Sequence, residues 1–191
     1  MRGFLLTERE ASLWDRLTAA DQLRSLLTIG VIGILAGLFM SHVRLHLGLS
    51  GHKAFFWITP IVTARLLLRC PVGATVATLG AAFTSLALGG HFAGGVLALP
   101  VIALAGGVLD VLIGFAQRRR LAAVWVIPLL GLGGAFANLL CVFKRLAAPP
   151  GPFHHYLWAI PGFWTDLASY VLCGFFAGLA GAALARGIRR R

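Results

Sequence analysis

Three cysteines are the residues best suited to hold a metal or react with a ligand. Cys70, Cys141 and Cys173 lie in or beside apolar stretches, and an odd count without a CxxC pair does not indicate a disulfide framework. Cys70 precedes Pro71 at the predicted start of a helix. The positive end of a helix favours a thiolate, which is the form of cysteine that binds metals. Cys70 is therefore the best thiolate candidate of the three.

Histidines gather in two segments between apolar runs, and the second of these segments also holds aromatic residues. The segment 42–53 holds three histidines, and the segment 144–166 holds two more among four prolines. No histidine pair has the spacing of a closed zinc site. The aromatic residues fit either a belt at a membrane interface or a lid over a ligand site. The candidate ligand-binding residues in and beside these segments are His52, Trp57, His154, His155, Tyr156 and Trp158.

Two polar residues lie deep inside apolar runs. Asp110 carries a charge whose placement at a membrane centre costs about 2.5–3.5 kcal/mol, so we expect it to pair with Arg65 or to serve a function. Asn138 can cross-link helices or face a ligand. The sequence contains no HExxH, GxSxG or Walker motif, so the residues do not support a hydrolase or an ATPase.

The composition indicates the element type that must position these residues. Of 191 residues, 59% are hydrophobic and 12% are charged, against roughly a quarter charged in soluble domains. This excludes a soluble enzyme and a disordered tail, and it favours an all-α integral membrane protein. The net charge of +11 could suggest nucleic acid, but the arginines flank apolar runs, which is typical of membrane topology and anionic lipid. We therefore expect no nucleic-acid partner.

Six apolar segments are each read as a transmembrane helix, after a cytoplasmic amphipathic helix in residues 1–24. The six-helix substrate-binding domain would then fill residues 25–191. The expected spans are 25–41, 54–68, 72–90, 94–116, 121–143 and 167–185. With a cytoplasmic N-terminus, twelve basic residues fall inside and four outside, while Arg65 lies within a span. This asymmetry predicts that both termini are cytoplasmic.

The first span carries a small-residue motif. Gly33 and Gly37 are four residues apart, so they share one helix face that another helix can approach closely. That face can pack within the chain or dock a partner protein.

The six-helix architecture, the small-residue face at Gly33 and Gly37, and the Gly-Leu-Ser-Gly-His turn at 48–52 resemble the S components of energy-coupling factor transporters. The resemblance implies a substrate-binding subunit for vitamin uptake in the bacterial inner membrane. It implies docking of a coupling transmembrane subunit with ATPases at the first helix, although that family usually has alanines there. It implies no enzyme activity and no intrinsic cofactor.

One branch of that family works as solitary cobalamin transporters. A cysteine ligates the cobalt of the bound corrinoid in that branch, and Cys70 would take this role here. The resemblance thus makes cobalamin the first substrate to consider, with biotin, thiamine and riboflavin still open. Two other functions stay open. A nickel or cobalt ion permease could use the histidines, although the start Met1-Arg2-Gly3 lacks that family's Met-His site. A membrane scaffold or an intramembrane enzyme is the other.

Overall fold

The protein is described from a computed structural model that covers residues 19–42, 51–68, 70–89, 96, 99–147 and 163–190. In these ranges the structure has six α-helices and no β-strand. The helices are α2 (Ala19–His42), α3 (Ala54–Leu68), α4 (Gly73–Ala87), α5 (Leu99–Arg118), α6 (Ala123–Ala147) and α7 (Phe163–Arg189).

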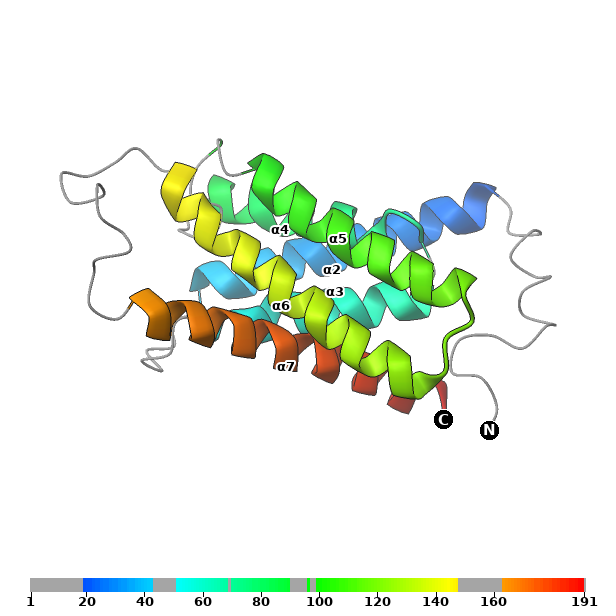
Figure 1. The fold of residues 1–191 in the computed structure, drawn as a ribbon. Helices are drawn as coiled ribbons and strands as arrows, with labels where there is room; N and C mark the ends of the chain where they lie inside the picture. The colour runs from blue at the N-terminus through cyan, green and yellow to red at the C-terminus, as the bar shows by residue number, and fades with distance from the viewer. Residues whose placement is uncertain are drawn as a thin grey trace.

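The helices lie side by side in one bundle and alternate in direction along the chain (Figure 1). α2 begins and α7 ends at the same end of the bundle, which we call the terminal end. The opposite end, where α3 and α7 begin, is called the distal end. An even number of helices in alternating directions brings the first and last described residues to one end.

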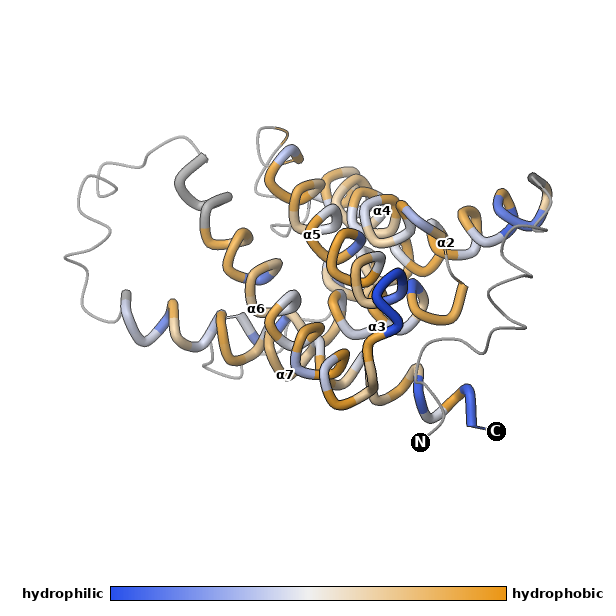
Figure 2. Tube along the Cα trace, turned by 45° about the vertical axis from the view of Figure 1, so that its right-hand side comes forward, coloured by the Kyte–Doolittle hydropathy of each residue, from blue (hydrophilic) through white to orange (hydrophobic). Residues whose placement is uncertain are grey.

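Four of the helices have the length and composition of membrane spans. α2, α5, α6 and α7 each contain a candidate span of 20 to 26 residues that is apolar on average. Their outward side chains are apolar too, such as Val111 and Val124, each 69% exposed. Figure 2 shows hydrophobic residues along the helices and hydrophilic ones toward their ends. The chain is therefore a membrane protein with helices of transmembrane type.

The remaining two helices are apolar but short. α3 and α4 have 15 residues each, or about 23 Å, which is less than the about 30 Å of a bilayer core. α3 contacts each of the other five helices and occupies the centre of the bundle. Eight of its side chains are buried, including Trp57 and Arg65.

Small residues and hydroxyl groups bring α7 close to its neighbours. Thr59 and Thr63 of α3 donate hydrogen bonds to the carbonyl oxygens of Ala177 and Gly181, at 3.0 and 3.1 Å. A Cβ atom on Gly178 would overlap the backbone of α6. These close approaches supply the packing that holds helices together where apolar side chains alone give little advantage.

The predicted segments match the described helices closely, with differences at their ends. The second segment has the bounds of α3, and the expected all-α class is confirmed. α2 begins at Ala19 and continues through residue 24, so residues 19–24 belong to the same helix as the first predicted span. Residues 1–18 of the predicted amphipathic helix lie outside the described residues. α7 extends beyond the predicted 167–185 at both ends.

Candidate functional site

Asn138 of α6 organises the distal end of the bundle. Its side chain is 2% exposed, and its Nδ2 donates to the carbonyl oxygens of Tyr170 at 2.8 Å and of Gly51 at 3.3 Å. The amide therefore ties α6 to α7 and to the turn that precedes α3. This is the cross-linking role that the sequence suggested for a buried asparagine.

Gly51 is required at this turn for two reasons. Its φ of +82° lies in the left-handed region, which glycine adopts most readily. A Cβ at this position would also lie 2.8 Å from the Cα of Tyr170. The backbone of the turn therefore packs directly against α7, and its carbonyl faces Asn138.

His52 and Trp57 lie at the same end. His52 follows Gly51 in the turn, is half-buried, and its carbonyl oxygen accepts a hydrogen bond from Phe55 N at 3.3 Å. Trp57 lies in the first turns of α3 and is 1% exposed, so its indole belongs to the core. The structure thus gathers three sequence-predicted residues, His52, Trp57 and Asn138, at the distal end.

Four further predicted residues lie outside the described residues. They are His154, His155, Tyr156 and Trp158, in the segment 148–162. That segment joins the end of α6 to the start of α7, and both of these points belong to the distal end. Their role as a lid or as an interfacial belt stays a prediction.

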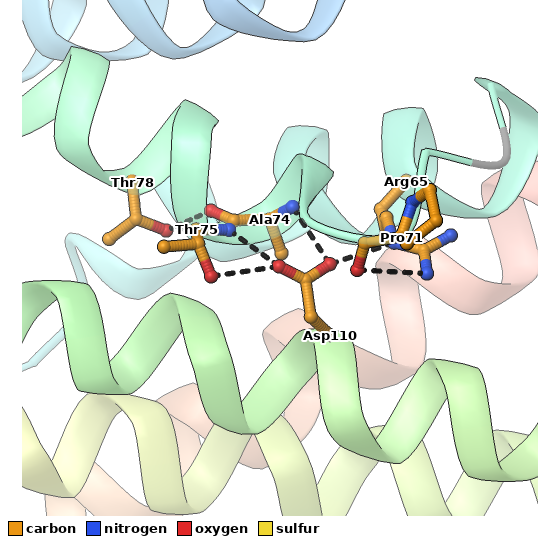
Figure 3. Close-up of polar contacts among 6 residues, drawn as sticks. All are labelled: Arg65, Pro71, Ala74, Thr75, Thr78 and Asp110. Atoms are coloured by element: carbon orange, nitrogen blue, oxygen red, sulfur yellow. Dashed lines mark hydrogen bonds and ion pairs between the residues drawn. The ribbon is translucent and has the colours of Figure 1, made fainter. Parts of the chain in front are cut away.

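A second polar cluster lies inside the bundle around Asp110 of α5, where α3 ends and α4 begins (Figure 3). Asp110 Oδ1 accepts from Arg65 Nε at 2.8 Å and from Ala74 N at 3.0 Å. Asp110 Oδ2 accepts from the backbone N and the hydroxyl of Thr75, each at 2.8 Å. The pairing of Asp110 with Arg65 is the structural role considered from the sequence. With four donors, the carboxylate has no acceptor site to spare for a ligand.

Charged side chains of α5 and α7 bind the backbone at the two helix ends where the chain passes from α3 to α4. Asp110 places a negative charge at the N-terminus of α4, where Val72 offers no side-chain cap. Arg189 of α7 donates to the carbonyl oxygen of Leu66 near the C-terminus of α3. Each charge has the sign that the helix dipole favours at that position. The cluster therefore stabilises two helix ends that meet inside the bundle.

Cys70 lies between α3 and α4 and not at the distal end. It is 6% exposed, and its carbonyl oxygen accepts from Gly73 N at 3.0 Å. The 15-residue α3 lies between Cys70 and Gly51, and it is about 23 Å long. The structure therefore does not bring Cys70 together with His52, Trp57 and Asn138.

The other two cysteines belong to α6 and α7. Cys141 and Cys173 are buried, and Cys173 Sγ lies 4.0 Å from Ser169 Oγ. Within the part of the chain that the structure describes, no group of three His, Cys, Asp or Glu residues could hold a metal ion.

Gly33 and Gly37 face α4 of the same chain. A Cβ on Gly33 would overlap the carbonyl oxygen of Ala77, and one on Gly37 would approach that of Ala81. The small-residue face thus serves packing within the chain, which was one of its two interpretations. A partner helix would have to displace α4 to reach it, and docking there stays a prediction.

Sequence reasoning missed Thr75, Tyr170 and Arg189. Thr75 and Arg189 donate to groups on other helices, and Tyr170 accepts from Asn138 through its backbone carbonyl. No local pattern marks such roles, because each depends on which helices become neighbours. No protein family, curated protein or solved structure matches this chain.

Proposed function

We propose that this chain is a membrane-embedded substrate-binding protein for vitamin uptake, similar to an S component, in a bacterial inner membrane. The observation that supports this most is the gathering of His52, Trp57 and Asn138 at the distal end. The segment with the other four candidate residues also attaches there. A ligand site in this position opens on the side away from both termini.

In the proposed topology all six helices cross the membrane and both termini are cytoplasmic. α2, α5, α6 and α7 supply four crossings by length and composition. α3 and α4 run in opposite directions and would supply the other two crossings. The number of crossings is then even, so both termini lie on one side. The excess of arginine near the terminal end favours the cytoplasm for that side.

Cobalamin is the proposed substrate to test first, with Cys70 as the proposed cobalt ligand. Thiolates bind cobalt, and α3 is shorter than a bilayer, so Cys70 lies deeper than the end of a full span would. Cys70 follows the end of α3, whereas Asn138 of α6 lies beside the turn that precedes α3. Contact of a corrinoid with one of these residues therefore does not imply contact with the other. Each residue therefore needs its own test.

The proposal makes no use of ATP within this chain. Uptake would depend on a coupling transmembrane subunit with ATPases, or the chain would work alone. This chain is expressed with and without a coupling module in cells that lack their own cobalamin transporter. Uptake of labelled cobalamin by the two kinds of cells separates these cases.

The decisive experiment is identification of the ligand. The protein is purified in mild detergent from cells grown with vitamins, and its absorption and mass spectra are recorded. We expect an organic vitamin bound at near one per chain. A protein that carries none, and that shows no affinity for cobalamin, biotin, thiamine or riboflavin, would contradict the proposal.

Variants then locate the site. Asn138→Leu should weaken vitamin binding at least tenfold, or about 1.4 kcal/mol. Thr63→Val is the matched control, because it also removes a hydrogen bond between helices but lies farther from the distal turn. Equal losses in both variants would show a general packing defect and not a site at Asn138.

A further inference from the structure

The turn between α5 and α6 holds three consecutive arginines at the terminal end. Arg118, Arg119 and Arg120 are all exposed. Figure 2 shows this stretch as the hydrophilic end of a mainly hydrophobic helix. Because α5 is a helix of transmembrane type, its end lies at the level where lipid headgroups meet the protein.

The backbone of this turn holds the arginines in a fixed arrangement. Arg120 has a φ of +48°. Leu121 N donates to Ala116 O and Arg120 N donates to Gln117 O, each at 3.1 Å, which is the pattern of a Schellman motif. Glycine adopts this left-handed position without strain, whereas arginine does not. The turn therefore retains a positive charge where the backbone alone would favour glycine.

The charge of the three arginines is not balanced by an acid on the same hairpin. Asp110 is the only acidic residue between positions 99 and 147, and its carboxylate is filled by Arg65 and the start of α4. Guanidinium groups bind phosphate oxygens in bidentate geometry. The triplet therefore offers donors suited to a phosphate group.

Apolar side chains flank the arginines on both helices. The guanidinium carbon of Arg119 lies 5.9 Å from the centre of the Phe115 ring, which is 48% exposed. Trp125 in the first turn of α6 is 66% exposed. A ligand that contacts both the charges and these rings must carry an anionic head and an apolar tail.

We propose that the α5–α6 turn is a binding site for an anionic phospholipid. The phosphate would accept hydrogen bonds from Arg118, Arg119 and Arg120, and the acyl chains would lie along Phe115 and Trp125. This site lies at the terminal end and is separate from the vitamin site proposed at Asn138. It requires only that the chain is embedded in a membrane.

Native mass spectrometry of the detergent-purified protein tests the proposal. Phosphatidylglycerol and phosphatidylcholine with the same acyl chains are added at equal concentration. We expect the wild type to retain phosphatidylglycerol in preference. Arg118→Gln/Arg119→Gln should lower that retention at least fivefold, since each basic residue near a phosphate contributes about that factor.

Arg24→Gln/Arg190→Gln is the matched control, because it removes the same net charge from exposed positions outside the turn. Retention within twofold of the wild type is expected for this variant. Equal losses in both variants would overturn the proposal, since they would reflect general surface charge. Retention of inorganic phosphate alone, without preference for the lipid, would overturn it as well.

Further measurements show whether a loss of lipid binding reflects misfolding, and whether something other than a lipid occupies the turn. Arg120→Gly should keep the thermal stability at least equal to wild type, because glycine suits the turn, while phosphatidylglycerol retention falls. Phosphatidylglycerol with brominated chains should quench a fluorescence component that Trp125→Phe removes. If phosphatidylglycerol binds only after residues 2–18 are deleted, that segment is the occupant and the proposal is wrong.

Discussion

The carboxylate of Asp110 accepts both the backbone N–H and the hydroxyl of Thr75, each at 2.8 Å. Thr75 lies in the first turn of α4, which has no capping side chain at its own N-terminus. A residue of α5 thus closes a helix that begins inside the bundle. Backbone N–H groups in such a position need a partner, because an unsatisfied polar group in hydrocarbon costs several kcal/mol.

Loss of the Asp110 charge should therefore destabilise the fold. Asp110→Asn keeps the shape of the side chain but leaves the buried guanidinium of Arg65 without a counter-ion. Removal of one partner of a buried pair typically costs about 3–5 kcal/mol. We expect that loss in the free energy of unfolding, measured by circular dichroism in detergent.

Two comparison variants separate the effect of the lost ion pair from the effect of the lost hydrogen bonds at the N-terminus of α4. Arg65→Met/Asp110→Asn removes both charges and should recover at least half of the lost stability. Thr75→Val removes only a neutral donor and should cost about 1 kcal/mol. A double variant no more stable than Asp110→Asn would show that the ion pair is not the source of the effect.

Substitution of the small-residue face should damage the fold before it affects any partner. Gly33→Leu/Gly37→Leu places side chains where the backbone of α4 now lies. We expect α2 and α4 to separate, with a lower melting temperature and weaker ligand binding. Gly114→Ala is the control, because a Cβ at that position meets nothing within 4 Å. Normal stability of the leucine variant with loss of uptake would instead favour partner docking at this face.

The helices could be predicted from the sequence because each coincides with a continuous run of apolar residues. The bounds of α3 follow from the apolar run 54–68, despite Pro60 inside it. The start of α2 could not be predicted, since Asp21 and Arg24 interrupt the apolar pattern while the helix continues. A charged residue in the first turns of a helix changes the hydropathy but not the backbone geometry.

The candidate site was predicted in its residue types and not in its arrangement. Asn138 stands out because a buried amide must find partners. Its partners are two backbone carbonyls, of Gly51 and Tyr170, and no side-chain pattern reveals them. The separation of Cys70 from Asn138 could not be predicted, because it requires knowing that Asn138 binds the turn before α3.

Two glycines with positive φ provide a matched pair for the distal turn. Gly51 and Gly89 have φ of +82° and +66°, but only Gly51 packs against Tyr170. Gly89→Ala should cost about 1 kcal/mol from the backbone alone. Gly51→Ala should cost more and should weaken vitamin binding, because the turn must move away from α7. Unfolding curves and calorimetry measure the two effects, and equal costs would argue against close packing at this turn.

The proposed topology predicts the side of the membrane on which reporters are active. A reporter fused after Arg191 should be active only in the cytoplasm. A second reporter inserted after Gly151, between α6 and α7, should be active only outside. The two helices that flank this insertion point are long enough to cross the bilayer, so the two reporters must report opposite sides. Activity of both on one side would contradict the crossing of α7.

The cysteines allow cobalt ligation to be tested apart from vitamin binding. Cys70, Cys141 and Cys173 are all buried, so none forms a surface thiol that reacts by exposure alone. Each is changed to serine separately, and the protein is titrated with cobalamin while the absorption spectrum is recorded. If Cys70 ligates cobalt, only Cys70→Ser should lose the ligand-field shift. Asn138 binds the Gly51 turn before the start of α3, whereas Cys70 follows the end of this helix of 15 residues, about 23 Å long. Asn138→Leu should therefore leave that shift unchanged at saturating cobalamin. An unaltered spectrum in Cys70→Ser would end the assignment of Cys70, and binding that depends on Asn138 alone would place the corrinoid at the distal end.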